Sequence, residues 1–386
     1  MNILLLSDVY HPRVNGVSTS IETLRDGLLA AGHAVTLVVP AYDGEASQDG
    51  VIRVAGRSFS FDPEDRLMDW GDLRRNLEAL PGPFDVVHIH TPFFAHYAGV
   101  RFARLHGLPV LETYHTLFEE YFYHYLPILP HSWLKRLARG LSRRQCNATD
   151  AVVAPSGPMR DALREYGVST RIEVLPTGLP PATFNPGEGA GFRARHNIPA
   201  ERKIMLFVGR VAFEKNIAFL LRVVARLTGT RQDVCFVIAG EGPAERDMHK
   251  EARHLNITER VHFLGYLDRQ RELPDCYRAA DVFVFASRTE TQGLVLLEAM
   301  AQGTPVVALA EMGTKDILLE GEGCRIAPDD VDSFARLVDE VLTDPAQHAR
   351  LSERARAHAG LWSAAHMAER MSGLYADLAA QTPAPR

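Results

Sequence analysis

Short apolar runs alternate with amphipathic stretches along almost the whole chain. Continuous apolar runs that are separated by helical patterns predict the strands of parallel sheets, which helices cover on both faces. The strands expected in the first half are 3–6, 35–39, 86–89, 110–113, 151–154 and 172–174. The strands expected in the second half are 204–208, 234–239, 261–264, 282–285 and 306–309.

The clearest helical pattern places Ile21, Leu24, Leu28 and Ala31 on one face and ends at Gly32. Two series of alternating strands and helices predict an α/β protein with two doubly wound, Rossmann-like domains. We expect the domains at 1–180 and 200–360, with a Pro- and Gly-rich linker at 181–199. Ligands of such sheets bind at the carboxyl ends of the strands, so we expect the chemistry there, in a cleft between the domains.

Composition narrows the class of protein. An apolar content of 46% and a charged content of 23% are typical of a folded globular chain. The formal net charge of −6 argues against a protein that coats itself in positive charge to bind nucleic acid. Four scattered cysteines without a Cys-x-x-Cys pair indicate reduced core thiols in a cytoplasmic protein. No targeting or membrane-spanning segment is expected from the sequence.

The loop after the first expected strand enters a helix through Asn15-Gly16-Val17-Ser18. A glycine at this place lets an anionic group approach the backbone N–H groups at the positive helix end. The loop lacks the Gly-x-Gly-x-x-Gly pattern, which weakens a nicotinamide hypothesis. The alternative is a plain turn in which Ser18 caps the helix.

Two loops of the second half also follow strands and enter helices. In the first, Arg210 and Lys215 supply two cations that could hold a diphosphate, although solvated surface charge is the alternative. In the second, Gly240-Glu241-Gly242 permits a close approach to the backbone, which is a weak signal alone.

The strongest signal is the spacing of Glu290 and Glu298, which lie on either side of Gly293. The first carboxylate follows a buried strand, and the second lies two turns along the next helix on roughly the same face. Two carboxylates placed in this way could grip two hydroxyl-bearing parts of one long ligand.

Taken together, the Gly16 loop, Gly-Arg-x4-Lys, Gly-Glu-Gly and Glu-x7-Glu resemble the retaining family-4 glycosyltransferases of GT-B fold, over about residues 2 to 360. The resemblance implies a sugar-nucleotide donor, transfer that keeps the anomeric configuration, no cofactor and no metal. It also implies that a C-terminal helix from about residue 362 packs on the first domain.

The resemblance further implies roles for individual residues. Those expected to act in catalysis are Glu290 beside the transferred sugar, Arg210 and Lys215 on the diphosphate, and His115 near the sugar and the acceptor. Those expected to bind the donor are Gly16, Gly240, Gln292, Gly293, Leu294 and, on the ribose hydroxyls, Glu298. For His115 we favour the orientation of hydroxyls or the stabilisation of charge over a role as general base.

Two further pairs were weighed as metal ligands. His88 and His90 would lie on one face of a strand, but no third ligand is evident. Asp330 and Asp332 open a helical pattern and are interpreted as charge in its first turn.

Residues 121–149 contain no acidic residue but five basic ones. A basic amphipathic helix with aromatic residues suits the surface of an anionic membrane. The residues expected to face the membrane or acceptor are Tyr121, Tyr125, Trp133, Lys135, Arg136, Arg139, Arg143 and Arg144. In the alternative, Leu134, Leu137 and Leu141 pack on the domain and the arginines are merely solvated.

His115-Thr116 with the residues that follow, and Thr291-Gln292-Gly293 after Glu290, resemble the diacylglycerol α-glucosyltransferase branch, to which the phosphatidylinositol mannosyltransferases are related. This resemblance implies transfer of glucose from UDP-glucose to a lipid at the inner face of the cytoplasmic membrane. The alternatives are a soluble or polysaccharide-precursor acceptor, a GDP-mannose-dependent lipid mannosyltransferase, an epimerase, and a non-catalytic sugar-nucleotide-binding protein.

Overall fold

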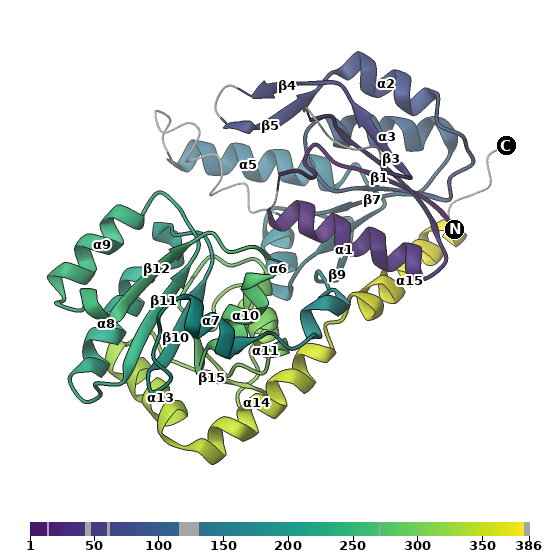
Figure 1. Cartoon of the computed structure of the whole chain (residues 1–386). Helices are drawn as coiled ribbons and strands as arrows, with labels where there is room; N and C mark the ends of the chain where they lie inside the picture. Colours follow the sequence, from purple (N-terminus) through teal and green to yellow (C-terminus); the bar gives the residue numbers. More distant parts are fainter. Residues whose placement is uncertain (14, 43–47, 60–61, 116–130, 270, 382–386) are drawn as a thin grey trace. The chain divides into compact units, whose positions relative to one another are not determined.

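The computed structural model describes residues 1–13, 15–42, 48–59, 62–115, 131–269 and 271–381 (Figure 1). The chain divides into two compact units. The first comprises Met1–Gly178 and Ala364–Arg386, and the second comprises Leu179–Ser363. The α/β class expected from the sequence is confirmed, because each unit is built on a parallel sheet with helices.

The sheet of the first unit has seven strands in the order β3-β2-β1-β6-β7-β8-β9, all paired in parallel. Its strands are β1 (Asn2–Leu6), β2 (Ala34–Pro40), β3 (Val51–Val54), β6 (Val86–Ile89), β7 (Val110–Thr113), β8 (Ala151–Ala154) and β9 (Arg171–Val174). The sequence pattern missed β3, an edge strand whose first three residues are only partly buried. It also missed an antiparallel hairpin of β4 (Gly56–Phe59) and β5 (Asp62–Met68).

The helices of this unit are α1 (Gly16–Ala30), α2 (Trp70–Glu78), α3 (Phe94–His106), α5 (His131–Cys146), α6 (Gly157–Glu165) and α15 (Ala364–Gln381). In α1, Ile21 and Leu28 are fully buried as the periodicity predicts, whereas Leu24 is only partly buried and Ala31, which follows the helix, is exposed. The cap is Asn15 and not Ser18, since the Asn15 side chain accepts hydrogen bonds from the backbone N–H groups of Val17 and Ser18. Ser18 completes the capping box by bonding back to the Asn15 N–H at 2.9 Å.

The last helix, α15, belongs to the first unit although it ends the chain. It buries Met367, Met371, Leu374, Tyr375 and Leu378 in the same cluster as β1 and β2. A Cβ on Gly27 of α1 would lie 2.8 Å from the Ala368 Cβ, so this glycine allows α1 and α15 to approach closely. Figure 1 shows α15 in yellow, beside the purple α1.

The second unit has a six-stranded sheet in the order β12-β11-β10-β13-β14-β15. This order matches the 3-2-1-4-5-6 arrangement of a doubly wound nucleotide-binding sheet. Its strands are β10 (Lys203–Val208), β11 (Val234–Ala239), β12 (Val261–Gly265), β13 (Val282–Phe285), β14 (Val306–Ala308) and β15 (Cys324–Ile326). The sequence pattern found all of these except the three-residue β15.

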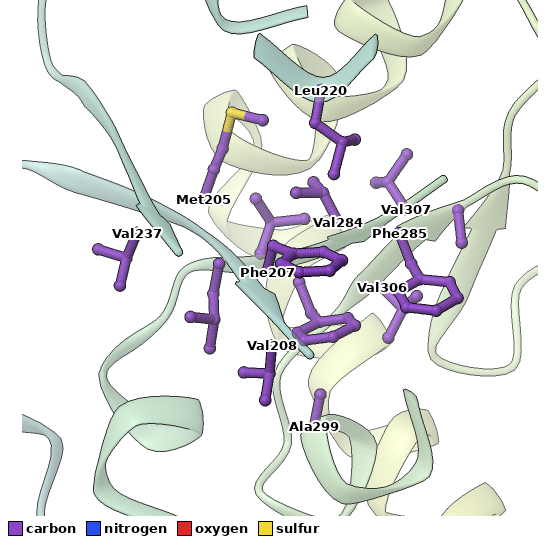
Figure 2. Close-up of a cluster of buried hydrophobic side chains, with 14 of the residues drawn as sticks. Met205, Phe207, Val208, Leu220, Val237, Val284, Phe285, Ala299, Val306 and Val307 are labelled. Carbon is purple, nitrogen blue, oxygen red and sulfur yellow. The ribbon is translucent and has the colours of Figure 1, made fainter. Parts of the chain in front are cut away.

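Helices cover this sheet, and its core is apolar. Figure 2 shows part of the core, where the rings of Phe207 on β10 and Phe285 on β13 stack with their centroids 6.0 Å apart. The α-helices are α7 (Gly189–Arg195), α8 (Ile217–Thr228), α9 (Glu245–His254), α10 (Glu272–Ala279), α11 (Leu294–Ala301), α12 (Thr314–Ile317), α13 (Val331–Thr343) and α14 (Pro345–Gly360). Short 3-10 turns are η1 (Pro181–Phe184), η2 (Phe213–Lys215) and η3 (Thr258–Arg260).

The interpretation of residues 181–199 as a linker is wrong. The segment contains η1 and α7 and folds with the second unit. Gln302 bonds to three backbone groups of the segment, accepting from the Gly187 N–H and donating to the carbonyls of Thr183 and Asn185. A Cβ on Gly187 would lie 2.3 Å from the Pro274 carbonyl oxygen. Gly187 and Gly189 thus serve close packing against α10 and not flexibility.

This packing predicts that Gly187→Ala destabilises the protein by about 1–3 kcal/mol, because the added methyl overlaps the backbone of α10. Gly373→Ala in α15 is the matched control, since its Cβ meets no atom within 4 Å. The control should be neutral or stabilising, because alanine is a better helix residue than glycine. Thermal unfolding of both variants measures the difference, and equal unfolding temperatures would contradict the assignment.

Candidate active site

The turns after β10 and β11 are pressed together at the carboxyl edge of the second sheet. Gly209 and Gly240 both have positive φ, 150° and 137°. A Cβ on Gly240 would lie 2.0 Å from the Gly209 carbonyl oxygen, and the Gly240 N–H donates to the Gly265 carbonyl at 2.7 Å. Packing within the protein thus explains Gly240, and its role in donor binding stays a prediction.

Lys215 and Glu290, which lie in different loops, form an ion pair at this edge. The Lys215 Nζ lies 2.5 Å from the Glu290 Oε2, and each side chain is 20% exposed. Lys215 ends η2, and Glu290 follows β13. The neighbouring Asn216, at φ 55°, donates from Nδ2 to the Ala286 carbonyl at 3.2 Å, which ties the two loops together. Sequence reasoning missed Asn216, although its place next to Lys215 at the start of a helix was visible.

Arg210 differs from Lys215 in its surroundings. Arg210 is exposed, and within the described part of the chain no acidic side chain pairs with it. The two cations expected to act together are therefore not equivalent, because one is held by a carboxylate and the other is open to an anionic ligand.

Glu298 lies on α11 and is buried, but both of its oxygens have donors. Oε2 accepts from the Tyr277 hydroxyl at 2.8 Å, and Oε1 accepts from Arg269. Burial, together with the Glu298 carboxylate, raises the pKa of Tyr277 well above its ordinary value, so this hydroxyl stays a donor. Sequence reasoning missed Tyr277 and Arg269. No spacing in the sequence pairs Tyr277 with Glu298.

The segment 291–293 leads into α11 and is tightly held. Gly293 has φ 95°, and a Cβ on Gly313 would lie 1.9 Å from the Thr291 carbonyl oxygen. Gln292 is buried, and α11 begins at Leu294. The N–H groups at the positive end of this helix therefore follow directly after Glu290, in a place suited to an anion or a hydroxyl.

In the first unit, His115 follows β7 and joins a chain of hydrogen-bonded rings. Its Nε2 lies 3.1 Å from the His90 Nδ1. The rings of His90 and His88 are 4.1 Å apart. His88 in turn bonds through Nδ1 to the Tyr375 hydroxyl and through Nε2 to the Thr113 hydroxyl, both at 2.7 Å. The His-x-His pair is thus engaged within the protein. Among the residues that the structure describes, no three His, Cys, Asp or Glu side chains form a set that could hold a metal ion.

All three histidines have lowered pKa values. Burial lowers the pKa of His88 to about 3 and that of His115 to about 4. Burial, and then the neighbouring His88 and His115, lower the pKa of His90 well below its ordinary value. The three rings are therefore neutral near pH 7.

A cavity of about 30 Å³ lies at the carboxyl edge of the first sheet, between α1 and α15. Its lining includes His90, His115 and the hydroxyl residues Ser20, Thr23, Thr113 and Thr177. A polar space of this size has room for about one or two water molecules. Gly16, at the start of α1, has no atom within 4 Å of the place of a Cβ, so packing inside the described structure does not require a glycine there.

The helix α5 packs on the first unit through small and polar residues. Ala138, Ser142, Gln145 and Cys146 are buried, and the Ser142 hydroxyl lies 2.8 Å from that of Tyr114. Leu137 is 59% exposed, contrary to the alternative in which it packs inward. The basic residues Arg136, Arg139, Arg143 and Arg144 are exposed, and Lys135 is partly so. Tyr121, Tyr125 and the Trp133 side chain lie outside the described residues.

Asp330 was considered together with Asp332, either as a metal ligand or as charge at the start of a helix. Its side chain accepts from the Ser333 N–H at 2.8 Å and caps α13, as the interpretation as first-turn charge predicts.

Two solved structures share this architecture over nearly the whole chain. The sucrose-phosphate synthase of Thermosynechococcus elongatus superposes with a TM-score of 0.78 at 23% identity, covering 98% of this chain and 99% of that one. HepE of Anabaena, in complex with UDP-glucose, gives a TM-score of 0.74 at 16% identity over 98% and 100% of the two chains. These likenesses define the fold class, GT-B with two Rossmann-like domains.

Sequence comparison identifies the family. The model of "Glycosyltransferase Family 4" matches residues 14–183, and that of "Glycosyl transferases group 1" matches residues 191–358. The alpha-monoglucosyldiacylglycerol synthase of Streptococcus pneumoniae is 35% identical over 319 residues, 80% of this chain and 71% of the relative. A GDP-mannose-dependent phosphatidylinositol dimannoside mannosyltransferase of Mycobacterium tuberculosis is 26% identical over 95% of this chain and 94% of the relative. The chain belongs to the family-4 glycosyltransferases, in the branch that contains these lipid-modifying enzymes.

The lowered histidine pKa values predict that stability falls in mild acid. Below pH 6.5 the unfolded chain binds protons at His88, His90 and His115 that the folded chain does not, so unfolding becomes easier as the pH falls. The loss is on the order of 1 kcal/mol for each histidine per pH unit below 6.5. Urea unfolding at pH 7.5 and 5.5 measures it. His88→Gln should flatten this pH dependence, whereas His366→Gln on the exposed face of α15 should leave it unchanged. A wild-type midpoint that does not move between the two pH values would contradict the prediction.

Proposed function

We propose that the protein is a retaining glycosyltransferase that moves a hexose, glucose from UDP-glucose, onto a membrane lipid such as diacylglycerol. The main structural support for the proposed transfer reaction is the Lys215–Glu290 ion pair at the carboxyl edge of the second sheet. The substrates are inferred from the Streptococcus pneumoniae relative, a diacylglycerol glucosylating enzyme by name.

In the proposed reaction, the bond from the sugar C1 to the diphosphate oxygen breaks and a bond from C1 to the acceptor hydroxyl oxygen forms on the same face. The leaving diphosphate takes the proton of the acceptor hydroxyl, so no dedicated base is required. Lys215 and the exposed Arg210 stabilise the negative charge that develops on the diphosphate. Glu290, next to Lys215, is placed to hold hydroxyls of the transferred sugar.

The donor's ribose is proposed to bind Glu298. Tyr277 and Arg269 fix this carboxylate in one orientation, which lowers the entropic cost of binding a diol. At the first unit, the free space above Gly16 would admit an anion to the N-terminus of α1. No cofactor and no metal are proposed.

The activity is tested with a donor panel and a total lipid extract, with products identified by mass spectrometry and their anomeric configuration by NMR. UDP-glucose should give an α-linked glucolipid. A β-linked product would contradict retention. Release of an epimerised sugar nucleotide without an acceptor, or no consumption of any donor, would contradict the transferase.

Substitution tests the site itself. Lys215→Met should lower kcat about 100- to 1000-fold, because the leaving diphosphate loses a fixed charge. Lys250→Met is the control, since Lys250 is an exposed lysine of α9 that pairs only with Asp247 within the described residues. Steady-state kinetics on the identified donor measure both variants, and normal turnover of Lys215→Met would overturn the assignment.

Two other substrates have specific support among the relatives. The Mycobacterium tuberculosis enzyme uses GDP-mannose by name, and it matches 95% of this chain. A D-inositol 3-phosphate glycosyltransferase of Stackebrandtia nassauensis is 31% identical over 80% of this chain and 71% of the relative, and its named acceptor is soluble. GDP-mannose and inositol 3-phosphate therefore belong in the same panel.

We further propose that the protein binds the cytoplasmic membrane peripherally through α5. No helix within the described part of the chain is long and apolar enough to span a bilayer. The outer side of α5 carries exposed arginines together with the exposed Leu137, which suits an anionic lipid surface.

The membrane proposal predicts that Arg139, Arg143 and Arg144 contribute to binding vesicles that contain anionic lipid. Replacing all three with Ser should weaken binding about 100-fold, at about 1 kcal/mol for each basic residue near the surface. Replacing Arg246, Lys250 and Arg253 on the exposed face of α9 removes the same charge elsewhere and should have little effect. Vesicle sedimentation measures both, and equal binding by the two triple variants would favour a soluble acceptor.

A further inference from the structure

His90 has one hydrogen-bonded nitrogen and one without a partner. Its Nδ1 faces the His115 Nε2 at 3.1 Å. Its Nε2 is buried, and within the described structure no atom hydrogen-bonds to it. The His90 ring is 2% exposed and is held between the rings of His88, at 4.1 Å, and His115, at 5.4 Å.

A neutral imidazole carries a single N–H, so the unpartnered nitrogen decides where that proton lies. A buried N–H without an acceptor costs more than a buried lone pair without a donor. The favoured form therefore has the proton on Nδ1 and the lone pair on Nε2. In this form, a water molecule in the adjoining cavity can donate to that lone pair.

We infer that His90 is a positioning residue that donates from Nδ1 to the His115 Nε2 and so fixes His115 as its Nδ1–H tautomer. Because its Nε2 lone pair is occupied, neutral His115 carries its only proton on Nδ1. Within the described residues, that nitrogen has no hydrogen-bond partner, and His115 lines the cavity and is partly exposed. His115 thus presents a hydrogen-bond donor to a ligand and has no free lone pair with which to remove a proton.

The rest of the chain of rings holds His90 in this orientation. His88 has partners on both nitrogens, the Tyr375 hydroxyl from α15 and the Thr113 hydroxyl from β7. His88 therefore cannot rotate without losing a hydrogen bond, and its ring lies against that of His90 at an interplanar angle of 32°. The last helix of the chain is in this way linked to the orientation of His115.

The tautomer can be measured directly by ¹⁵N NMR of the full chain labelled at histidine, at pH 7.5 and without substrate. The His115 signals are assigned by their loss in His115→Asn. A protonated Nδ1 and an unprotonated Nε2 at His115 are expected. The reverse pattern would overturn the inference, and this measurement does not depend on the proposed activity.

Replacing His90 with Asn or Gln tests whether its hydrogen bond to His115 matters or only the space that its side chain fills. The Asn amide nitrogen can occupy the place of the histidine Nδ1, whereas that of Gln reaches the place of Nε2. His90→Asn should keep the Nδ1–H form of His115. His90→Gln should return His115 to a mixture dominated by the Nε2–H form, which free histidine prefers. If both variants are folded by circular dichroism and leave the His115 tautomer the same, the inference is wrong.

A kinetic readout rests on the proposed function. With the identified donor, His90→Gln should lower kcat about 10- to 100-fold through loss of one oriented hydrogen bond, with little change in the donor KM. His90→Asn should stay within about threefold of wild type. Equal loss in both variants would show a merely structural role. If the wild type turns over no donor, the proposed function fails while the NMR result still stands.

Discussion

A parallel strand that is buried on both faces has no place for an uncompensated polar side chain until it ends. In both units this constraint confines most of the chemistry to the carboxyl edge of the sheet. Lys215, Glu290 and the turn at Gly240 follow β10, β13 and β11, and His115 follows β7. Within each unit, crossover helices return the strands of the parallel sheet in the same direction, so the loops of that unit gather at one edge although they are distant in sequence.

Besides Glu112 of β7, which bonds to His96, His88 is an exception to this constraint. It lies inside β6 and is fully buried, so both of its nitrogens need partners. One partner comes from the neighbouring strand and the other from Tyr375 on α15, 287 residues further along the chain. The C-terminal helix therefore does more than cover apolar surface, because without the Tyr375 hydroxyl one nitrogen of His88 would be buried without a partner.

Glu290 and Glu298 in the second unit likewise have hydrogen-bond or ion-pair partners within the protein. Glu298 is satisfied by Tyr277 and Arg269, and Glu290 is paired with Lys215, all without a ligand. Such charges are already oriented, so a substrate that meets them does not have to reorganise solvent around them. A donor diphosphate that binds Lys215 would also relieve Glu290 of its partner and free that carboxylate for hydroxyls.

Periodicity alone was sufficient to predict most strands and the buried face of α1, because these follow from which positions must be apolar. It failed at β3 and β15, which are short and lie at sheet edges, where fewer positions are buried on both faces. The Pro- and Gly-rich segment before β10 was misinterpreted because glycine signals either freedom or close contact, and only the neighbouring backbone of α10 distinguishes them. The motifs identified Glu290, Lys215 and His115, but no pattern indicated Tyr277 or the contacts of His88 with Tyr375 and of His90 with His115. Those contacts join distant segments, and no local spacing encodes them.

The helix α5 buries small and polar side chains on its inner side and exposes Leu137 with several arginines on its outer side. One exposed leucine is common on protein surfaces and alone indicates nothing. Here, however, the inward side is built from Ala138, Ser142, Gln145 and Cys146, which make specific contacts such as that of Gln145 with the Pro92 carbonyl at 2.6 Å. The helix is therefore anchored without Leu137, whose apolar surface remains beside exposed arginines. In the proposed membrane-bound state, Leu137 would enter the apolar phase and the exposed arginines would meet the lipid phosphates.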